Sequence, residues 1–253
     1  MAGLPDDLTT QIAANKRRAT ALLTGVATVV VVVVWALASA AGAGLVGLVL
    51  GVVLAVAVTG AAWTRSEAVA LSLARARPAD VEGHARLHNL VEGLCAAAGV
   101  PKPALYVVES ERPDAFAVGR GPRRAAVVCT AGLTDKLNRM ELEGVIAHEL
   151  SHVKNYDILP ATLAVTLVGV PGALVPPLRA ALLRWVVGTH REAVGDVSGV
   201  ALTRYPPGLI AALEKLRHEG TGTPIHGPKA IDHLWLDSST EDVDERIAAL
   251  REL

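Results

Sequence analysis

The feature that most constrains this chain is a long uncharged segment near its start. Between Arg18 and Arg65 no residue is charged, and the segment includes the runs TVVVVVVWALA and LVGLVLGVVLAVAV. A helix that spans a bilayer needs about 20 apolar residues, so this segment accommodates two. The small residues from Ser39 to Gly44 give the natural turn between them. Residues 19–64 are therefore predicted to form a transmembrane helical hairpin, with residues 1–18 as a tail before it.

Two other interpretations of this segment fit less well. A secretory signal peptide has a much shorter apolar core, followed by a cleavage site. A pair of buried helices in a soluble core rarely lacks charge over such a length.

The basic residues that flank the hairpin predict its orientation. Lys16–Arg18 precede the first span, Arg65, Arg75 and Arg77 follow the second, and the turn has no basic residue. By the positive-inside rule both ends of the hairpin are cytoplasmic. We therefore expect a multi-pass protein of the plasma membrane whose residues 65–253 face the cytoplasm. The inverted topology is the alternative.

The composition narrows the class further. The formal net charge is −1, so we expect no nucleic-acid partner. Aromatic residues make up only 3% of the chain, and a soluble core must therefore be aliphatic. Cys95 and Cys129 lack the paired spacing of a disulfide framework or a cysteine-based zinc site, which favours a reducing compartment.

Behind the hairpin, helical and strand patterns alternate over short distances. Apolar residues recur at helical spacing from Asp80, the expected N-cap, to Ala98, and Gly99 ends that helix. Asn138 and Glu141 are expected to form a capping box for a later helix. The other expected elements are strands at 104–110, 115–118 and 125–130, helices around 190–196, at 209–219 and at the C-terminus, a strand or turn at 233–236, and a mobile loop at 220–229. This pattern indicates an α+β fold, mainly helical with a small β-sheet.

The helix after the capping box carries the sequence GVIAHELSHVKNYD, residues 144–157. His148 and His152 are four residues apart, so both imidazoles lie on one helix face and can bind one ion. Glu149 lies beside them, within reach of a water molecule at that ion. Hydrolytic zinc needs neutral nitrogen ligands, an open position and a carboxylate base. The pattern therefore predicts one Zn²⁺ per chain, with Glu149 as general base.

The alternative is a helix that happens to carry two histidines, because the five letters HExxH also arise by chance. The same helix holds Val145, Ile146, Leu150 and Val153, which bury one of its faces. Histidine and glutamate side chains that faced a core without a metal would stay unsatisfied. This context favours the metal site.

A third ligand must come from elsewhere, because the continuation HVKNYDIL lacks the glycine and third histidine of a metzincin. Downstream, HREAVGD offers Glu192, which completes a set of two histidines and one glutamate. His190 is the rival ligand, two residues before Glu192. Asp196, one turn further, can accept the distal N–H of His148 or His152. For both acids, an exposed helix face with ordinary charges is the alternative.

These segments resemble a known family. The stretches DAFAVGRGPRRAAVVCTAGLTDKL and MELEGVIAHELSHVKNYDIL are similar to the HtpX group of membrane zinc metalloproteases, relatives of the CAAX prenyl proteases. Those enzymes carry a Pro-Asn-Ala-Phe-Ala strand, an HExxH helix and a later Glu-x-x-x-Asp helix. The matching stretches here are Pro113–Ala117, His148–His152 and Glu192–Asp196.

The resemblance implies a zincin-like metalloprotease domain over residues 65–253. It implies that zinc is bound by His148, His152 and Glu192, that Glu149 is the general base, and that Ala115, Phe116 and Ala117 form an edge strand to which substrate backbone adds. The terminal DERIAAL resembles a Glu-Glu-Arg-Ile helix of the family, which suggests Arg246 near the site as a transition-state stabiliser; a surface arginine is the equal alternative. Two positions depart from the family pattern, because Asp114 replaces an asparagine and STEDVD replaces Thr-His-Pro.

The segment between the two ligand helices constrains the topology. Ligands of one ion lie on one side of a membrane, so the chain between His152 and Glu192 crosses it an even number of times. Two spans need about 40 apolar residues, but Pro160, Pro171 and Arg179 are among the residues that interrupt this stretch. We predict no complete crossing and an apolar, membrane-associated hairpin or flap at residues 158–187. A pair of shortened, tilted spans is the alternative.

Together these features predict a membrane-anchored zinc metalloendopeptidase. Its expected partners are the lipid bilayer and polypeptide substrates, above all membrane or misfolded proteins. A catalytically silent membrane adaptor with a structural zinc site is the alternative. Glu149 argues against the adaptor, because structural zinc sites are closed by four protein ligands and need no base.

Overall fold

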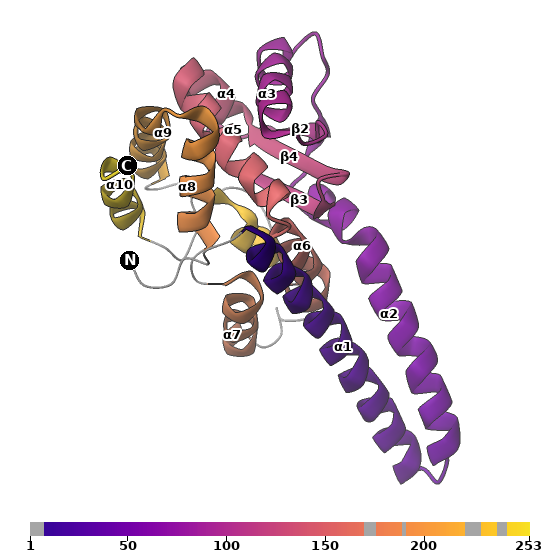
Figure 1. The fold of residues 1–253 in the computed structure, drawn as a ribbon. Coiled ribbons are helices and arrows are strands. Elements are labelled where there is room, and N and C mark those ends of the chain that lie inside the picture. The colour runs from indigo at the N-terminus through magenta and orange to yellow at the C-terminus, as the bar shows by residue number, and fades with distance from the viewer. Residues whose placement is uncertain (1–7, 170–175, 189–190, 221–228, 237–241) are drawn as a thin grey trace.

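The computed structural model of the chain describes residues 8–169, 176–188, 191–220, 229–236 and 242–253. Two long helices, α1 (Leu8–Ala40) and α2 (Gly44–Leu73), project as a pair from a body of shorter elements (Figure 1). The turn between them, residues 41–43, lies inside the predicted one. The body is mainly helical with a small sheet, which confirms the α+β class behind a helical hairpin.

Small residues of α2 hold the hairpin together. A Cβ at Gly47 would lie 2.2 Å from Ala38 Cβ, and one at Gly51 would lie 3.1 Å from Val31 Cα. Such close backbone approach stabilises helix pairs in lipid, where burial of apolar surface drives little association. The outward faces expose apolar side chains, and both helices are long and apolar enough to cross a bilayer.

Within the described residues the sheet has four strands in the order β1-β2-β4-β3. They are β1 (Arg77–Pro78), β2 (Ala104–Val108), β3 (Ala115–Gly121) and β4 (Arg124–Thr130). β2 and β4 are parallel, whereas the pairs β1–β2 and β3–β4 are antiparallel. The three predicted strands are confirmed, and β3 lies at an edge. β1 is only two residues long and contains a proline, so no strand pattern marks it in the sequence.

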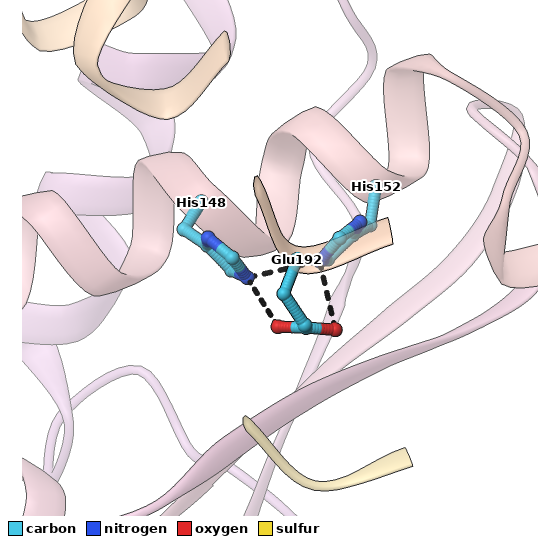
Figure 2. A group of neighbouring side chains, drawn as sticks. All are labelled: His148, His152 and Glu192. Carbon is cyan, nitrogen blue, oxygen red and sulfur yellow. Dashed lines mark hydrogen bonds and ion pairs between the residues drawn. The ribbon is translucent and has the colours of Figure 1, made fainter. Parts of the chain in front are cut away.

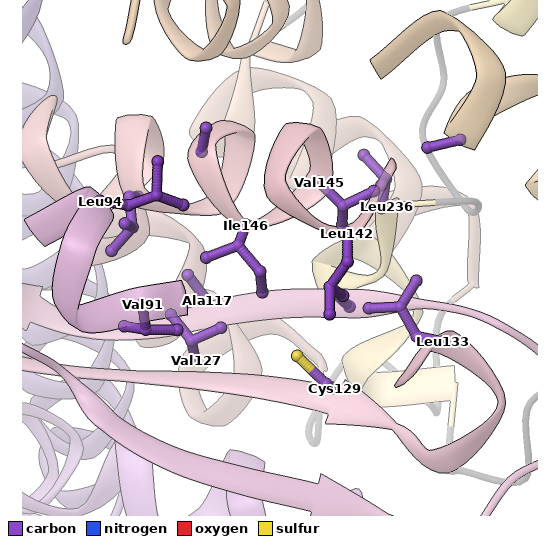
Figure 3. Packing of buried hydrophobic residues seen from close by; sticks show 14 of the residues in the cluster. Val91, Leu94, Ala117, Val127, Cys129, Leu133, Leu142, Val145, Ile146 and Leu236 are labelled. Atoms are coloured by element: carbon purple, nitrogen blue, oxygen red, sulfur yellow. The ribbon is translucent and has the colours of Figure 1, made fainter. Parts of the chain in front are cut away.

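The shorter helices surround this sheet. In chain order they are α3 (Ala85–Ala98), α4 (Ala131–Lys136), α5 (Arg139–Lys154), α6 (Ile158–Ala164), the π-helical turn η1 (Val165–Gly169), α7 (Pro176–Val187), α8 (Arg191–Thr203), α9 (Pro206–Gly220), the 3-10 helix η3 (Lys229–Leu234) and α10 (Val243–Arg251). α5 is central, because it packs on the strands and on α8 and α9. Its Leu142, Val145 and Ile146 join Val127 in a fully buried aliphatic core, as the low aromatic content requires (Figure 3).

One local prediction is wrong, and another is narrowed. Asp80 is not the N-cap of α3, which begins at Ala85; its carboxylate accepts the Gly83 N–H and lies 3.1 Å from His84 Nδ1, so it stabilises a separate turn before the helix. Gly99 ends α3 as predicted, with a left-handed φ of 68°. Of the strand or turn expected at 233–236, no strand forms: His233 and Leu234 are the last residues of the 3-10 helix η3. The loop predicted at 220–229 lies almost wholly outside the described residues.

The first part of the predicted flap is buried in the protein. α6 packs against α1, α2 and β3, and η1 packs against α2. Among the described residues only α1 and α2 pass as candidate spans, whereas Ile158–Gly169 is a shorter apolar helix. At a rise of about 1.5 Å per residue, such a helix does not cross a bilayer. Membrane association of residues 158–187 stays a prediction.

Candidate metal centre

The helix that carries the two histidines is fixed at its start and along its length. The Asn138 side chain accepts the N–H groups of Met140 and Glu141, and the Glu141 carboxylate accepts the Asn138 N–H, so the predicted capping box is confirmed. From Gly144 to Val153 every residue of α5 is buried. The functional side chains of α5 therefore stand on a rigid element.

Three side chains from two helices converge (Figure 2). Nε2 of His148 lies 2.9 Å from Nε2 of His152. The Glu192 carboxylate, on α8, places Oε2 3.2 Å from His148 Nε2 and Oε1 3.8 Å from His152 Nε2. One nitrogen or oxygen of each residue lies within 4.8 Å of the others, a spacing that can hold a metal ion. The rival ligand, His190, lies outside the described residues.

Two glycines of α8 allow this approach. A Cβ at Gly195 would lie 2.7 Å from Cε1 of both His148 and His152, and one at Gly199 would lie 2.8 Å from the His148 backbone nitrogen. Because these positions have no side chain, α8 lies directly on α5. Glu192, one turn before Gly195, thus reaches the imidazole pair.

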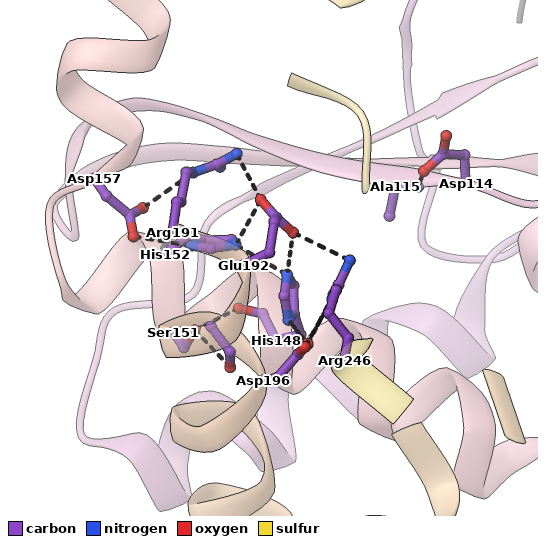
Figure 4. Close-up of polar contacts among 11 residues, drawn as sticks. Asp114, Ala115, His148, Ser151, His152, Asp157, Arg191, Glu192, Asp196 and Arg246 are labelled. Carbon is purple, nitrogen blue, oxygen red and sulfur yellow. Dashed lines mark hydrogen bonds and ion pairs between the residues drawn. The ribbon is translucent and has the colours of Figure 1, made fainter. Parts of the chain in front are cut away.

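Each imidazole contacts a second carboxylate through its other nitrogen (Figure 4). Nδ1 of His148 lies 2.8 Å from Asp196 Oδ1, and Nδ1 of His152 lies 2.9 Å from Asp157 Oδ2. A carboxylate at Nδ1 keeps the proton there, so the Nε2 atom of each neutral ring presents a lone pair. Both lone pairs point to the Glu192 carboxylate.

Two buried arginines hold the acids in place. Arg246 binds Asp196 with two hydrogen bonds, from Nε and Nη2, both 2.7 Å long. Its Nη1 lies 3.6 Å from Glu192 Oε2. Arg191 donates from Nη1 to Glu192 Oε1 at 3.1 Å, and its Nε lies 3.8 Å from Asp157 Oδ1. The structure therefore places Arg246 beside the site rather than on the surface.

The donor atoms and charges of this cluster fit a divalent cation. Two nitrogen lone pairs and a carboxylate oxygen at these distances repel one another unless a proton or a cation lies among them. The buried acids are Glu149, Asp157, Glu192 and Asp196, and the buried bases are Arg191 and Arg246. With both imidazoles neutral and Glu149 ionised, four carboxylates against two guanidiniums leave two negative charges, which one divalent ion neutralises.

The pKa shifts of His148 and Glu192 also favour a bound cation. Burial alone would lower the pKa of His148, but its contacts with Asp196 and Glu192 raise it to about 9. Burial opposes ionisation of Glu192 as well, yet Arg191 and the imidazoles hold its pKa well below its usual range. The carboxylates thus stay ionised and attract a positive charge to the imidazole pair.

Glu149 differs from these acids. It is 2% exposed, and within the described residues its Oε2 has no hydrogen-bond partner. Burial raises the pKa of Glu149, although the two imidazoles oppose the effect. A buried carboxylate beside a cation site, with one oxygen unused by the protein, suits the transfer of a proton.

The edge strand β3 runs past this cluster. Asp114 lies just before β3, and its carbonyl accepts the Thr130 N–H at 3.0 Å. Asp114 and Thr130 form a hydrogen-bonded pair, and such pairs alternate with non-hydrogen-bonded pairs along antiparallel strands. The register pairs Ala115 with Cys129 and Ala117 with Val127, which are therefore non-hydrogen-bonded pairs. The backbone N–H and C=O groups of Ala115 and Ala117 thus point away from β4. The Ala115 N–H is accepted by the Asp114 carboxylate at 2.8 Å. Burial raises the pKa of Asp114 well above its usual range.

Sequence reasoning missed two members of the cluster. Asp157 lies five residues after His152, beyond the end of α5, where no helical spacing marks it. The sequence marks Arg191 only by its position next to the predicted ligand Glu192. Of the predicted residues, the structure brings together His148, Glu149, His152, Glu192, Asp196 and Arg246.

Comparisons with known proteins give the family. A profile of Peptidase family M48 matches residues 82–176, which include both histidines and Glu149. A protease HtpX homolog of Dictyoglomus turgidum is 35% identical over 236 residues, covering 81% of this chain and 78% of the relative. The chain belongs to the HtpX-like proteases of this family. A protease HtpX homolog of Streptococcus agalactiae is 33% identical over 278 residues, covering 91% of this chain and 90% of the relative. No solved structure matches the chain.

Family membership gives the coarse activity of the chain. Members of Peptidase family M48 are metallopeptidases, and the related HtpX proteases are membrane proteins, in agreement with the two apolar helices here. The profile match ends at residue 176, before α8, so it does not include Glu192.

Proposed function

We propose that this HtpX-like protein is a zinc-dependent endopeptidase whose metal is held by His148, His152 and Glu192. The observation that carries the proposal is the convergence of two imidazole nitrogens and one carboxylate within 4.8 Å. Two neutral nitrogens and one carboxylate form the ligand set of hydrolytic zinc, with one position open. This ligand type favours zinc over other divalent ions.

When bound, zinc would act as a Lewis acid that polarises the substrate carbonyl and lowers the pKa of water towards about 7. Glu149 would accept a proton from the attacking water and deliver it to the leaving amine. Its burial, which raises its pKa, and its unused Oε2 suit this transfer. Asp157 and Asp196 would orient the two imidazoles throughout.

The substrate would bind as a strand along β3. The backbone groups of Ala117 face away from β4, whereas the Gly119 N–H is already bonded to Thr162 Oγ1 at 2.9 Å. Pairing through main-chain hydrogen bonds reads backbone shape rather than side-chain identity. Such recognition suits varied, extended polypeptides, and the helical hairpin would bring those that lie at the membrane within reach. We propose membrane and misfolded proteins as substrates.

The catalytic body is proposed to face the cytoplasm, because basic residues flank both outer ends of the hairpin. A reporter that becomes active only in the cytoplasm, fused after Leu253, tests this orientation. Activity supports the proposal. An inactive fusion, with a reporter specific for the other side active at the same position, contradicts it.

Two variants of the full-length protein test the enzyme itself. Glu149→Gln should keep zinc, measured as metal content of the purified protein, and lose hydrolysis of an unfolded protein substrate by at least roughly 100-fold. Glu192→Ala should lose both zinc and hydrolysis. A silent adaptor would instead show no zinc-dependent hydrolysis in the unaltered protein and no difference between it and Glu149→Gln.

A further inference from the structure

A basic surface surrounds the point where the two long helices enter the body. Arg120, Arg123 and Arg124 stand at the turn of the β3–β4 hairpin, Arg65 follows the apolar part of α2, and Lys16–Arg18 lie on α1. Of these, Arg123, Arg124, Arg65, Lys16 and Arg17 are exposed. We call this set of seven residues the basic face.

Aromatic contacts connect the β3–β4 hairpin to both long helices. The Arg120 guanidinium lies 5.6 Å from the centroid of the Trp63 ring, and Trp63 is 41% exposed on α2. Lys16 Nζ lies 4.3 Å from the centroid of the Tyr156 ring. That ring packs on the hairpin, since a Cβ at Gly121 would lie 2.3 Å from Tyr156 Cε1. The hairpin turn is therefore held between α1 and α2.

These contacts place the hairpin turn at the depth where a bilayer would end. Trp63 lies at the end of the uncharged segment, two residues before Arg65. Tryptophan is enriched at the boundary between lipid and water, and arginines next to a span lie at the headgroups. Arg120, in contact with Trp63, shares that level, and the turn residues Arg123 and Arg124 follow directly.

Within the described parts of the chain, no carboxylate neutralises the basic face. Within the described residues none of its seven members forms a salt bridge. Exposed bases elsewhere do, as Lys102 does with Glu92 and Arg251 with Glu214. Glu67, one turn beyond Trp63 on α2, is the nearest carboxylate in sequence, and it also takes part in no salt bridge in those parts of the chain.

We propose that the basic face binds the headgroups of anionic phospholipids, with the β3–β4 hairpin resting on the bilayer. A negatively charged leaflet attracts arginines at its surface, and the guanidinium matches phosphate oxygens in geometry. β3 is also the strand along which substrate is proposed to pair, so this contact sets the tilt of the substrate strand against the membrane. Only that second step rests on the proposed function; lipid binding does not.

Native mass spectrometry of the full-length protein in detergent tests the proposal. Titration with phosphatidylglycerol, which is anionic, is compared with phosphatidylcholine, which carries phosphate without net charge. The protein should retain phosphatidylglycerol in preference. In Arg123→Gln/Arg124→Gln the apparent affinity for phosphatidylglycerol should fall roughly tenfold, while binding of phosphatidylcholine stays unchanged.

The matched control is Arg139→Gln/Arg251→Gln, which also removes two exposed positive charges. The C-terminal end of α5 lies next to α1, because Asn15 Nδ2 donates to the carbonyl of Asn155, the C-cap of α5, at 3.0 Å. At about 1.5 Å per residue, Arg139, at the opposite end of α5, lies about 24 Å along the helix from this contact. This control should bind phosphatidylglycerol like the unaltered protein.

Equal retention of the two lipids by the unaltered protein would overturn the proposal. So would equal affinity of the hairpin variant and the unaltered protein for phosphatidylglycerol, or an equal loss in the control. Metal content and melting temperature of each variant show that it is folded. Glu149→Gln should bind the lipid normally, so failure of the enzyme proposal and failure of the lipid proposal are distinguishable.

Discussion

Oδ2 of Asp157 lies 2.9 Å from Nδ1 of His152, although Asp157 follows the end of α5. The contact depends on Tyr156, whose positive φ of 60° turns the chain back after the helix. The other oxygen of Asp157 lies 3.8 Å from Arg191 Nε. Asp157 therefore connects an imidazole on α5 with the arginine next to Glu192 on α8.

Asp157→Asn tests whether this contact supports metal binding. The amide has nearly the size of the carboxylate but no charge, so it holds the Nδ1 proton of His152 less firmly. Loss of such a partner typically weakens metal binding 10- to 100-fold. Competition with a chromophoric chelator measures the zinc affinity. Asp135→Asn, at an exposed aspartate of α4, is the control and should bind zinc normally. Normal affinity in Asp157→Asn would show that the contact is dispensable.

Gly195→Ala tests whether close helix packing assembles the site. The new Cβ would lie 2.7 Å from Cε1 of both histidines, so α8 or the rings must shift. We expect zinc affinity to fall at least roughly tenfold. Gly93→Ala is matched, because Gly93 is also helical and a Cβ there meets nothing within 4 Å. Alanine favours both helices by about 1 kcal/mol. A Gly195→Ala protein that binds zinc as tightly as the control contradicts this assembly.

Arg246→Lys separates two roles of the buried arginine. Its two 2.7 Å hydrogen bonds to Asp196 favour positioning of that carboxylate, and lysine cannot form the same bidentate pair. Positioning predicts roughly tenfold weaker zinc binding, with kcat at saturating zinc changed only a few-fold. A direct contribution to the transition state predicts normal zinc affinity and a large fall in kcat. Arg251→Lys, exposed on the same helix, should change neither quantity.

The sequence predicted those parts of the site that depend on local spacing. His148 and His152 share a helix face, and Asn138 with Glu141 marks where that helix begins, so both follow from α-helix geometry. Glu192 was predicted from the ligand set of hydrolytic zinc, with His190 as the rival, and the resemblance to known metalloproteases supported it; nothing in the spacing shows that α8 packs on α5. Gly195 and Gly199 permit this packing, but the sequence alone does not distinguish them from other small residues of a helix.

The features that escaped prediction depend on tertiary contacts. Asp157 reaches His152 through the left-handed backbone of Tyr156, a conformation that sequence rarely announces outside glycine and asparagine. β1 exists because Arg77 and Pro78 pair with β2, without a strand pattern of their own. Residues 233 and 234 fold into η3 because they pack on α6 and η1, which overrides their strand-like apolar alternation.

The packing of η3 gives a prediction about pH. His233 donates from Nε2 to the Ala161 carbonyl at 3.0 Å, and within the described residues its Nδ1 has no partner. Burial lowers the pKa of His233 to about 4, and the positive charges of Arg191 and Arg179 add to the effect. The folded protein therefore keeps His233 neutral, whereas the unfolded chain protonates it below a pH of about 6.5.

Stability should consequently fall as the pH drops from about 6.5 to about 4, because only the unfolded state gains this proton. The contribution is at most about 1.4 kcal/mol per pH unit. His233→Gln keeps an N–H donor for Ala161 but does not titrate, so the free energy of unfolding should depend less on pH over this range. Denaturant titrations at several pH values, with a chelator present so that metal release does not contribute, measure both proteins. His218→Gln, which alters a histidine near the end of α9, should retain the full pH dependence. Parallel curves for His233→Gln and the unaltered protein would mean that His233 takes up its proton in the folded state as readily as in the unfolded one.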